Sequence, residues 1–252
     1  MEINLQEKVA LVTGGSTGIG KETALLLAEC GAKVVVNYRE SDRAALEVVS
    51  EIKKNGGQAL AIPADVTQKG EINAMVQQLI ANFGSRIDIL INNAGSLIQR
   101  CSLLDLSEDI WDKVMEVNVK SIFLVTQAVV PYMGHGGRIV NVSSIAARTG
   151  GGPGSVHYAA AKGAVNTLTW GMAKELIEHG IIVNAVAPGL IATPFHVKYT
   201  ESDQFDNMKV KVPIGREGEA SEIAKAIVFL ASEHASYFMG EIMEVNGGWW
   251  MG

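Results

Sequence analysis

Short apolar runs alternate with longer amphipathic stretches along the first hundred residues. The runs KVALVTGG, KVVVNY, QALAIPADV and RIDILINNAG are rich in aliphatic and β-branched residues, and the first three precede stretches with helical spacing that end at Cys30, Asn55 and Phe83. This alternation predicts βαβ units, in which a crossover helix connects two parallel strands.

The same alternation continues through the second half of the chain. SEDIWDKVMEVNVKSIFLVTQAVVPYM predicts a long helix with Ser107 as its N-cap, and VHYAAAKGAVNTLTWGMAKELIEHG predicts a helix that ends at Gly180. RIVNVSS, IIVNAVAPG and GEIMEVNGG predict strands, and a last helix around ASEIAKAIVFLAS follows a polar, proline-bearing segment, 188–219. We therefore expect an α/β fold of the Rossmann type, a doubly wound parallel sheet of about seven strands flanked by six principal helices.

Composition narrows the class of protein. The 252 residues are 48% hydrophobic and 19% charged, and no linker-like stretch divides them, which predicts one domain over 1–252. The start, MEINLQEKVALVTGG, lacks the basic and apolar regions of a signal peptide, and no run of about 18 apolar residues occurs, so we expect a soluble, cytoplasmic protein with no membrane contact. The net charge of −6 without a basic run argues against nucleic acid as a partner. Cys30, Cys101 and the five histidines show no metal-ligand spacing, so no metal is expected.

A glycine-rich loop follows the first predicted strand. In TGGSTGIG, residues 13–20, Gly14, Gly18 and Gly20 allow a sharp turn and close approach of a pyrophosphate to a helix N-terminus, which predicts nucleotide binding. After the second strand, VVVNYRE places Asn37 where a carboxylate would bind the ribose of NAD, and Arg39 follows. Because arginine binds a phosphate bidentately, this favours NADP(H) over NAD(H). Alternatively, Arg39 is a solvated charge that pairs with Glu40 or Asp42.

A tyrosine and a lysine stand four residues apart in YAAAK, Tyr158 to Lys162. On a helix, positions four apart lie on one face, so the phenol and the ammonium can share a site. Taken alone, such a pair is more often two surface neighbours.

TGGSTGIG, NNAG at 92–95, the Tyr158 and Lys162 pair and PGLIAT at 188–193 occur in this order. Together they resemble the short-chain dehydrogenase/reductase family over essentially the whole chain, and the ending GEIMEVNGG is most similar to the branch of 3-oxoacyl-carrier-protein reductases and glucose dehydrogenases. The resemblance implies catalytic roles for Tyr158, Lys162, Ser144 and Asn118. Fourteen positions separate Ser144 from Tyr158, one more than in many members of the family, so Ser143 remains an alternative. The glycine-rich TGGGPGS between them can absorb an insertion.

The resemblance also implies a cofactor half, about 1–143, and a catalytic and substrate half, about 144–252, with a lid at about 190–213. The residues expected to contact the cofactor are Gly14, Ser16, Thr17, Gly18, Ile19, Gly20, Asn37, Tyr38, Arg39, Asp65, Val66, Asn92, Ala94, Gly95, Tyr158, Lys162, Pro188, Gly189, Ile191 and Thr193.

The expected chemistry is hydride transfer between NAD(P)(H) and a carbonyl or alcohol carbon. A free tyrosine has a pKa of about 10, and a cation about 5 Å away at an effective dielectric of about 20 stabilises the phenolate by about 3 kcal/mol. We therefore expect Lys162 to lower the pKa of Tyr158, the general acid/base, and to hold the cofactor ribose. Ser144 would orient the substrate oxygen, and the resemblance implies that Asn118 places a water in a proton relay behind Lys162.

The lid segment gives no signature of a charged substrate. His135 and His179 stand where carrier-protein reductases would present arginines, which favours a small-molecule ketone, alcohol or sugar; 3-oxoacyl-acyl-carrier-protein reduction is the enzymatic alternative, and Arg100 and Arg148 could compensate. A catalytically silent nucleotide-binding sensor is the alternative from another class. Trp249 and Trp250 near the end of the chain suggest a subunit contact, and members of the family are commonly tetramers, which implies a homotetramer.

Overall fold

A parallel seven-stranded sheet forms the centre of the molecule. The computed structural model describes residues 2–200 and 202–251, and its strand order is β3-β2-β1-β4-β5-β6-β9. This order confirms the predicted fold class. The strands are β1 (Val9–Val12), β2 (Lys33–Tyr38), β3 (Gln58–Pro63), β4 (Ile89–Asn92), β5 (Arg138–Val142), β6 (Ile182–Pro188) and β9 (Ile242–Val245).

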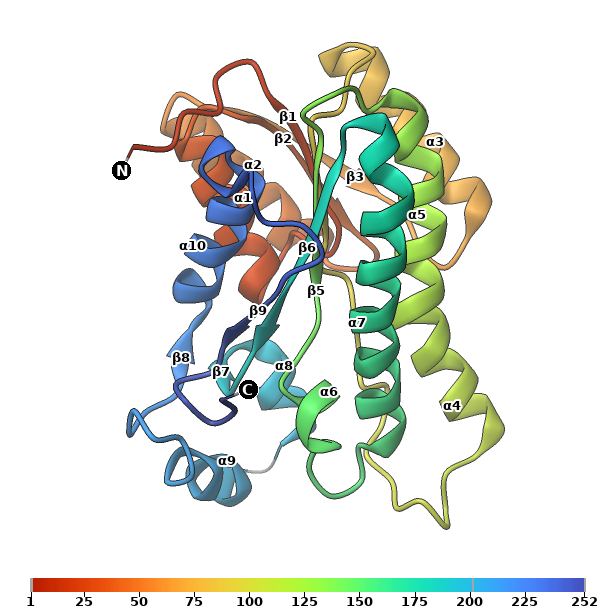
Figure 1. Ribbon diagram of the computed structural model, residues 1–252, viewed down its shortest axis with the longest axis vertical. Helices are drawn as coiled ribbons and strands as arrows, with labels where there is room; N and C mark the ends of the chain where they lie inside the picture. Colours follow the sequence, from red (N-terminus) through yellow and green to blue (C-terminus); the bar gives the residue numbers. More distant parts are fainter. Residues whose placement is uncertain (1, 201, 252) are drawn as a thin grey trace.

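Helices cover both faces of this sheet (Figure 1). The helices on one face are α1 (Gly18–Glu29), α2 (Asp42–Lys54) and α10 (Ala220–Ala231). Those on the other are α3 (Lys69–Phe83), α4 (Glu108–Met115), α5 (Ser121–Val129) and α7 (Val156–Leu176). Leu11 lies opposite Val35 and Leu90 in the register, and all three are buried in the second layer, whereas Val12 is buried in the first. Apolar side chains of the central strands are thus buried on both faces of the sheet, which explains the continuous apolar runs in the sequence.

The long helix predicted from Ser107 is present but is not uniform. The Ser107 hydroxyl accepts a hydrogen bond from the Ile110 amide at 3.3 Å, as an N-cap does. A π-helical turn, η1 (Glu116–Lys120), separates α4 from α5, and a short 3₁₀ turn, η2 (Val130–Tyr132), follows α5. Among the described residues, this 25-residue stretch alone is long and apolar enough to cross a membrane by length and composition; here its inner face packs in the core with α3 and α7.

Short elements gather at the carboxyl edge of the sheet. The segment 188–219, which the sequence marked only as polar, contains a two-stranded parallel sheet and two short helices: β7 (Ile191–Ala192), α8 (Pro194–Tyr199), α9 (Ser202–Lys209) and β8 (Gly218–Glu219). Another short helix, α6 (Ala146–Thr149), follows β5. At the opposite edge, α7 continues into a 3₁₀ turn, η3 (Ile177–His179), and ends at Gly180 with φ 69°, as predicted; a last turn, η4 (Glu233–Ala235), follows α10.

The strand order reverses beside β1, which has β2 on one side and β4 on the other. In doubly wound sheets, ligands bind in the crevice outside the carboxyl ends of the strands at such a switch point. The fold therefore locates the site at the edge where α6, α8 and the loop before α1 meet (Figure 1).

Candidate active site

A cavity of about 1030 Å³ runs along the carboxyl edge of the sheet. The glycine loop, the ends of β2 and β6, the start of α7 and the helix α8 all contribute to its wall. Most residues expected at the cofactor border this cavity, and so do Ser144, Tyr158 and Lys162. Gly20, Tyr38, Asn92 and Asn118 do not border it.

Gly20 does not border the cavity, because the backbone of the glycine loop at Gly14 packs directly against it. A Cβ at Gly20 would overlap the Gly14 carbonyl oxygen and would lie 2.5 Å from Asn93 Nδ2. Gly14 and Gly18 have φ angles of 60° and 54°, values that favour glycine. The loop is thus pressed against the first turn of α1, and Gly14 and the residues Ser16–Ile19 border the cavity.

Two residues that we did not select join the glycine loop to the NNAG segment. The Asn93 side-chain amide donates to the carbonyls of Thr13 and Gly14, at 2.9 and 3.0 Å. The Thr13 hydroxyl accepts from the amides of Asn93 and Ala94, at 3.0 and 3.1 Å. Both residues belong to the quoted motifs, so the polar positions of those motifs that precede the glycines carried the signal.

The last two residues of β2, Asn37 and Tyr38, and the following Arg39 all make contacts within the chain. Asn37 is buried, donates to the Ala64 carbonyl at 3.1 Å and accepts from the Gly14 amide at 3.3 Å, so its side chain supports the loop. The Tyr38 hydroxyl bonds to Asp42 at 2.6 Å, away from the cavity. The Arg39 side chain is 55% exposed and borders the cavity, but its guanidinium lies 2.9 Å from Glu40. The pairing that we gave as an alternative for Arg39 is therefore present, and it leaves the guanidinium at the cavity.

Asn92 is also a structural residue. It is buried at the end of β4, where its amide donates to Asn141 Oδ1 at 2.9 Å and to the Thr126 hydroxyl at 3.2 Å. These contacts lie among the strands and α5, so Asn92 fixes the position of the neighbouring Ala94 and Gly95 without reaching the cavity.

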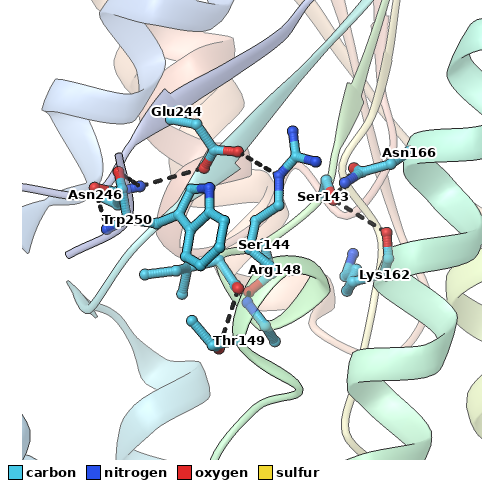
Figure 2. Close-up of polar contacts among 11 residues, drawn as sticks. Ser143, Ser144, Arg148, Thr149, Lys162, Asn166, Glu244, Asn246 and Trp250 are labelled. Carbon is cyan, nitrogen blue, oxygen red and sulfur yellow. Dashed lines mark hydrogen bonds and ion pairs between the residues drawn. The ribbon is translucent and has the colours of Figure 1, made fainter. Parts of the chain in front are cut away.

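The two adjacent serines after β5 point in opposite directions. The Ser144 hydroxyl is hydrogen-bonded to the Tyr158 side chain and accepts from the Ala146 amide at 3.1 Å. The Ser143 hydroxyl donates to Asn166 Oδ1 at 2.6 Å and approaches the Lys162 carbonyl at 3.2 Å, inside the protein (Figure 2). The structure thus brings Ser144, and not Ser143, to the tyrosine. Gly150, Gly151 and Gly154 take positive φ angles in the connecting loop, which accommodates the spacing of fourteen.

Lys162 lies beside the tyrosine at the bottom of the cavity. Its ammonium donates to the Val142 carbonyl at 2.7 Å and lies 5.6 Å from the centre of the Tyr158 ring. Gly95 makes this approach possible, because a Cβ there would lie 3.3 Å from the ammonium and 2.7 Å from Asn118 Oδ1.

Asn118 occupies the π-helical turn and is buried. Its amide nitrogen donates to the carbonyls of Ser96 and Val114, at 2.7 and 2.9 Å, and its oxygen lies 3.3 Å from the Ser96 amide. These bonds hold the segment that follows NNAG. π turns occur often at functional sites, since the extra residue redirects the backbone.

Burial dominates the protonation equilibria of this cluster. It raises the pKa of the Tyr158 phenol to about 12, and the hydrogen bond from Ser144 offsets only part of this rise. It also lowers the pKa of Lys162 to about 8. Our expectation of a lowered pKa for Tyr158 is therefore wrong for the chain by itself. The expectation counted the attraction of the lysine and omitted the cost of placing a phenolate away from water.

The helix α8 covers the tyrosine. The Phe195 ring lies 5.5 Å from the Tyr158 ring and 5.0 Å from the Tyr199 ring, centre to centre. Burial, together with the charge of Arg100, lowers the pKa of His196 to about 4, so this imidazole is neutral at physiological pH. Aromatic rings of α8 thus line the cavity next to Tyr158.

An ion pair connects α6 to the last strand. The Arg148 guanidinium lies 2.8 Å from Glu244, and the other oxygen of Glu244 accepts from the Asn246 amide at 3.2 Å (Figure 2). Asn246 in turn bonds to the backbone of Trp250, and Trp249 borders the cavity. The end of the chain is therefore joined to the helix that begins two residues after Ser144.

Within residues 2–200 and 202–251, no group of three or more histidine, cysteine, aspartate or glutamate side chains could hold a metal ion. The groups at the cavity that can take part in chemistry include the glycine cradle and the cluster of Ser144, Tyr158 and Lys162.

Comparison with known proteins agrees with this geometry. A family model described as enoyl-(acyl carrier protein) reductase matches residues 14–250. The chain is 42% identical to the uncharacterized oxidoreductase YgfF of Escherichia coli, over 95% of this chain and 99% of that protein. It is 43% identical to a 3-oxoacyl-[acyl-carrier-protein] reductase of Synechocystis sp., over 97% of each. A short-chain dehydrogenase of Burkholderia cenocepacia, solved in complex with NADP, superimposes with a TM-score of 0.92 at 35% identity, over 98% of this chain and 99% of that one.

A dinucleotide cradle at the switch point, next to a serine, a tyrosine and a lysine, is typical of nicotinamide-dependent oxidoreductases. The chain belongs to the short-chain dehydrogenase/reductase family. It is an NAD(P)-dependent oxidoreductase that acts on C=O and CH–OH groups, as the resemblance implied.

Proposed function

We propose that the protein reduces a small-molecule ketone with NADPH, and that Tyr158 donates the proton to the carbonyl oxygen. The observation that carries this proposal is the convergence of Ser144, Tyr158 and Lys162 on one cavity beside the glycine cradle. A dead site would have no physical need for this trio, which argues against the catalytically silent sensor.

The backbone around the cavity fits a dinucleotide. Glycines stand where a Cβ would close the cradle: at Gly14 it would lie 3.1 Å from the Cα of Ala94, and at Gly189 it would lie 2.7 Å from the Cα of Asn246. The loop before α1 would hold the pyrophosphate, Asp65 and Val66 the adenine, Ala94, Gly95 and Lys162 the ribose next to the nicotinamide, and Pro188, Gly189, Ile191 and Thr193 the carboxamide. When bound, the nicotinamide supplies or accepts the hydride.

The preference for NADP(H) rests on Arg39. It borders the cavity at the end of β2, and the side chain of Asn37 is occupied by the glycine loop, so no carboxylate at that position competes for a ribose hydroxyl. Asp65, 3.8 Å from Arg39, and Glu40 keep the guanidinium at the cavity mouth. A bound 2′-phosphate would replace Glu40 as the partner of Arg39.

The protonation states favour reduction at neutral pH. With its pKa raised to about 12, the Tyr158 phenol holds its proton and can give it to a developing alkoxide. The Ser144 hydroxyl orients the carbonyl oxygen toward the phenol. Lys162 stays largely charged below about pH 8 and stabilises the phenolate left after proton transfer. Asn118, which fixes Ser96 beside Gly95, keeps the path behind Lys162 in place for a proton relay.

A small-molecule substrate is favoured over acyl carrier protein by the aromatic lining of the cavity next to Tyr158. His135 and His179 do not bear on this choice, because both lie near the amino edge of the sheet, about 30 Å along α7 from Tyr158. Arg100, Lys198 and Lys211 do border the cavity. The carrier-protein alternative therefore remains, and the name of the Synechocystis relative supports it.

The decisive experiment measures NADPH and NADH oxidation with ketones, aldehydes, sugars and a 3-oxoacyl thioester, alongside titration of each nucleotide. Tyr158→Phe should lower kcat by about 10³ and weaken NADPH binding far less, because the phenyl ring that borders the cofactor is kept. Tyr132→Phe is the matched control, since that phenol bonds to Gln77 on α3, far from the cavity. Near-wild-type turnover by Tyr158→Phe would contradict the assignment, and nucleotide binding without turnover of any substrate would favour the sensor.

We further propose a homotetramer in the cytoplasm. Large apolar side chains are exposed on the faces that would meet: Leu104 (96%) and Phe123 (47%) near the long helix, and Tyr237 and Met251 (79%) near the end of the chain. Light scattering after size exclusion would test the mass, and a monomer would overturn this part. The boundary near residue 143 between cofactor and catalytic halves, and the lid at about 190–213, are proposed with the same function.

A further inference from the structure

The loop Ser96–Cys101, between β4 and α4, is held from several sides. Asn118 bonds to both backbone groups of Ser96. The buried imidazole of His157, the residue before Tyr158, lies 3.0 Å from the Gln99 carbonyl and 3.3 Å from that of Leu97. Ile98 between them has φ 64°, which a non-glycine residue rarely adopts. A backbone conformation of this kind persists only where the surroundings fix it.

Two side chains of this loop hold the helix α8. The hydroxyls of Ser96 and Tyr199 lie 2.7 Å apart. The Arg100 guanidinium donates through Nε to the Tyr199 carbonyl and through Nη1 to the Pro153 carbonyl, the latter at 2.8 Å. One arginine therefore joins the loop, the lid helix and the glycine-rich connection between Ser144 and Tyr158.

These bonds determine where the aromatic cover lies. Tyr199 takes part in both contacts, through its hydroxyl with Ser96 and through its carbonyl with Arg100, and its ring packs against Phe195, which packs against Tyr158. The Pro153 carbonyl belongs to the connection that carries the additional position, and the Gly154 carbonyl accepts from the Cys101 amide at 3.2 Å. The lengthened connection thus supplies the Pro153 carbonyl, which holds the Arg100 guanidinium in place while its Nε bonds to α8.

We propose that Arg100 is a positioning residue that fastens the lid helix α8 to the Pro153 connection and so sets the depth of the substrate pocket above Tyr158. The role requires arginine, because its planar guanidinium donates from two separate nitrogens to carbonyls on different segments, whereas the three donors of a lysine ammonium share one nitrogen at the end of a flexible chain. As a statement about substrate binding, it rests on the proposed function.

The first test needs no turnover. Hydrogen–deuterium exchange of the amides in 194–200 is compared in the wild type, Arg100→Ala, Arg100→Lys and Tyr199→Phe. We expect about tenfold faster exchange in Arg100→Ala, an intermediate effect in the other two variants, and no change in β1 or β5. Arg86→Ala is the matched control: this guanidinium also bonds to a distant carbonyl, that of His135 at 3.1 Å, but at the amino edge of the sheet.

The second test uses the reductase activity. Arg100→Ala should raise KM for the carbonyl substrate by about tenfold, equivalent to about 1.4 kcal/mol, with kcat lowered less and NADPH affinity unchanged. Unchanged exchange in 194–200, or exchange that accelerates equally throughout the chain, would overturn the proposal. So would an equal loss of NADPH affinity. Faster exchange confined to α8, in a protein that turns over no carbonyl substrate, would support the positioning role of Arg100 and contradict the proposed function.

Discussion

The adjacent residues Ser143 and Ser144 allow a test in which two alanine substitutions affect different properties: one lowers the stability of the protein, and the other lowers its turnover. Ser143→Ala removes a buried donor from Asn166 Oδ1, and Asn166 is itself only 4% exposed. Ser144→Ala removes the hydroxyl beside Tyr158 and the acceptor of the Ala146 amide at the start of α6, but it leaves no fully buried side chain without a partner. One change therefore acts on folding, and the other acts on proton transfer.

The expected magnitudes follow from these contacts. Leaving the buried Asn166 oxygen without a donor costs about 1–3 kcal/mol, which corresponds to a Tm lowered by about 2–12 °C for a chain of this size. Ser144→Ala should lower kcat by about 10²-fold, as for loss of one donor to a developing oxyanion, and should lower Tm less than Ser143→Ala does, because Ser144 is not fully buried.

Calorimetry and NADPH oxidation on the same preparations measure both effects. Asn166→Ala, alone and combined with Ser143→Ala, provides the matched cycle, because the double variant should be little worse than either single one. The reasoning is refuted if Ser143→Ala loses activity at unchanged Tm while Ser144→Ala remains active, since Ser143 would then be the serine of the site.

Three further predictions concern the cofactor and the lysine. Gly95→Ala should lower kcat by about tenfold or more at unchanged fold, since its Cβ would lie 2.7 Å from Asn118 Oδ1 and displace that side chain; wild-type kinetics with this variant would contradict the packing. Arg39→Ala should raise the Kd of NADPH by about tenfold and leave that of NADH within about twofold, measured by nucleotide fluorescence; equal losses would make Arg39 a general cofactor contact. Burial lowers the pKa of Lys162 to about 8, so its ammonium is charged below that pH and neutral above it. The value of kcat/KM for reduction should therefore fall about tenfold between pH 7 and pH 9. A flat profile over this range would show that the charge is not required.

The central sheet could be predicted because each strand is a continuous apolar run between helical stretches. The start of the helix at Ser107 and the end of the other long helix at Gly180 could also be predicted, because serine is a common N-cap and glycine adopts the left-handed conformation that ends helices. The elements of 188–219 could not be predicted, because they are too short to show a period and depend on contacts such as that of Tyr199 with Ser96.

The site was predictable as a set of positions but not as an environment. The motifs named Tyr158 and Lys162, yet only the structure shows how much burial affects the pKa of each. Likewise, spacing left two serines open, and the direction of each side chain at the end of β5 separates them. Asn37 was expected at a ribose and borders the cavity; its support of the glycine loop could not be predicted, because it depends on partners that only the fold brings to its buried amide.

The ion pair between Arg148 and Glu244 has a practical consequence for handling the protein. Through Asn246 it ties the backbone of Trp250 to α6, so a peptide fused shortly after Trp250 would pull on the same helix that follows Ser144. The amino terminus, in contrast, lies away from α6 and α8 (Figure 1). An affinity tag therefore belongs at the amino terminus, and kinetic constants measured on carboxyl-terminal fusions would describe a disturbed active site.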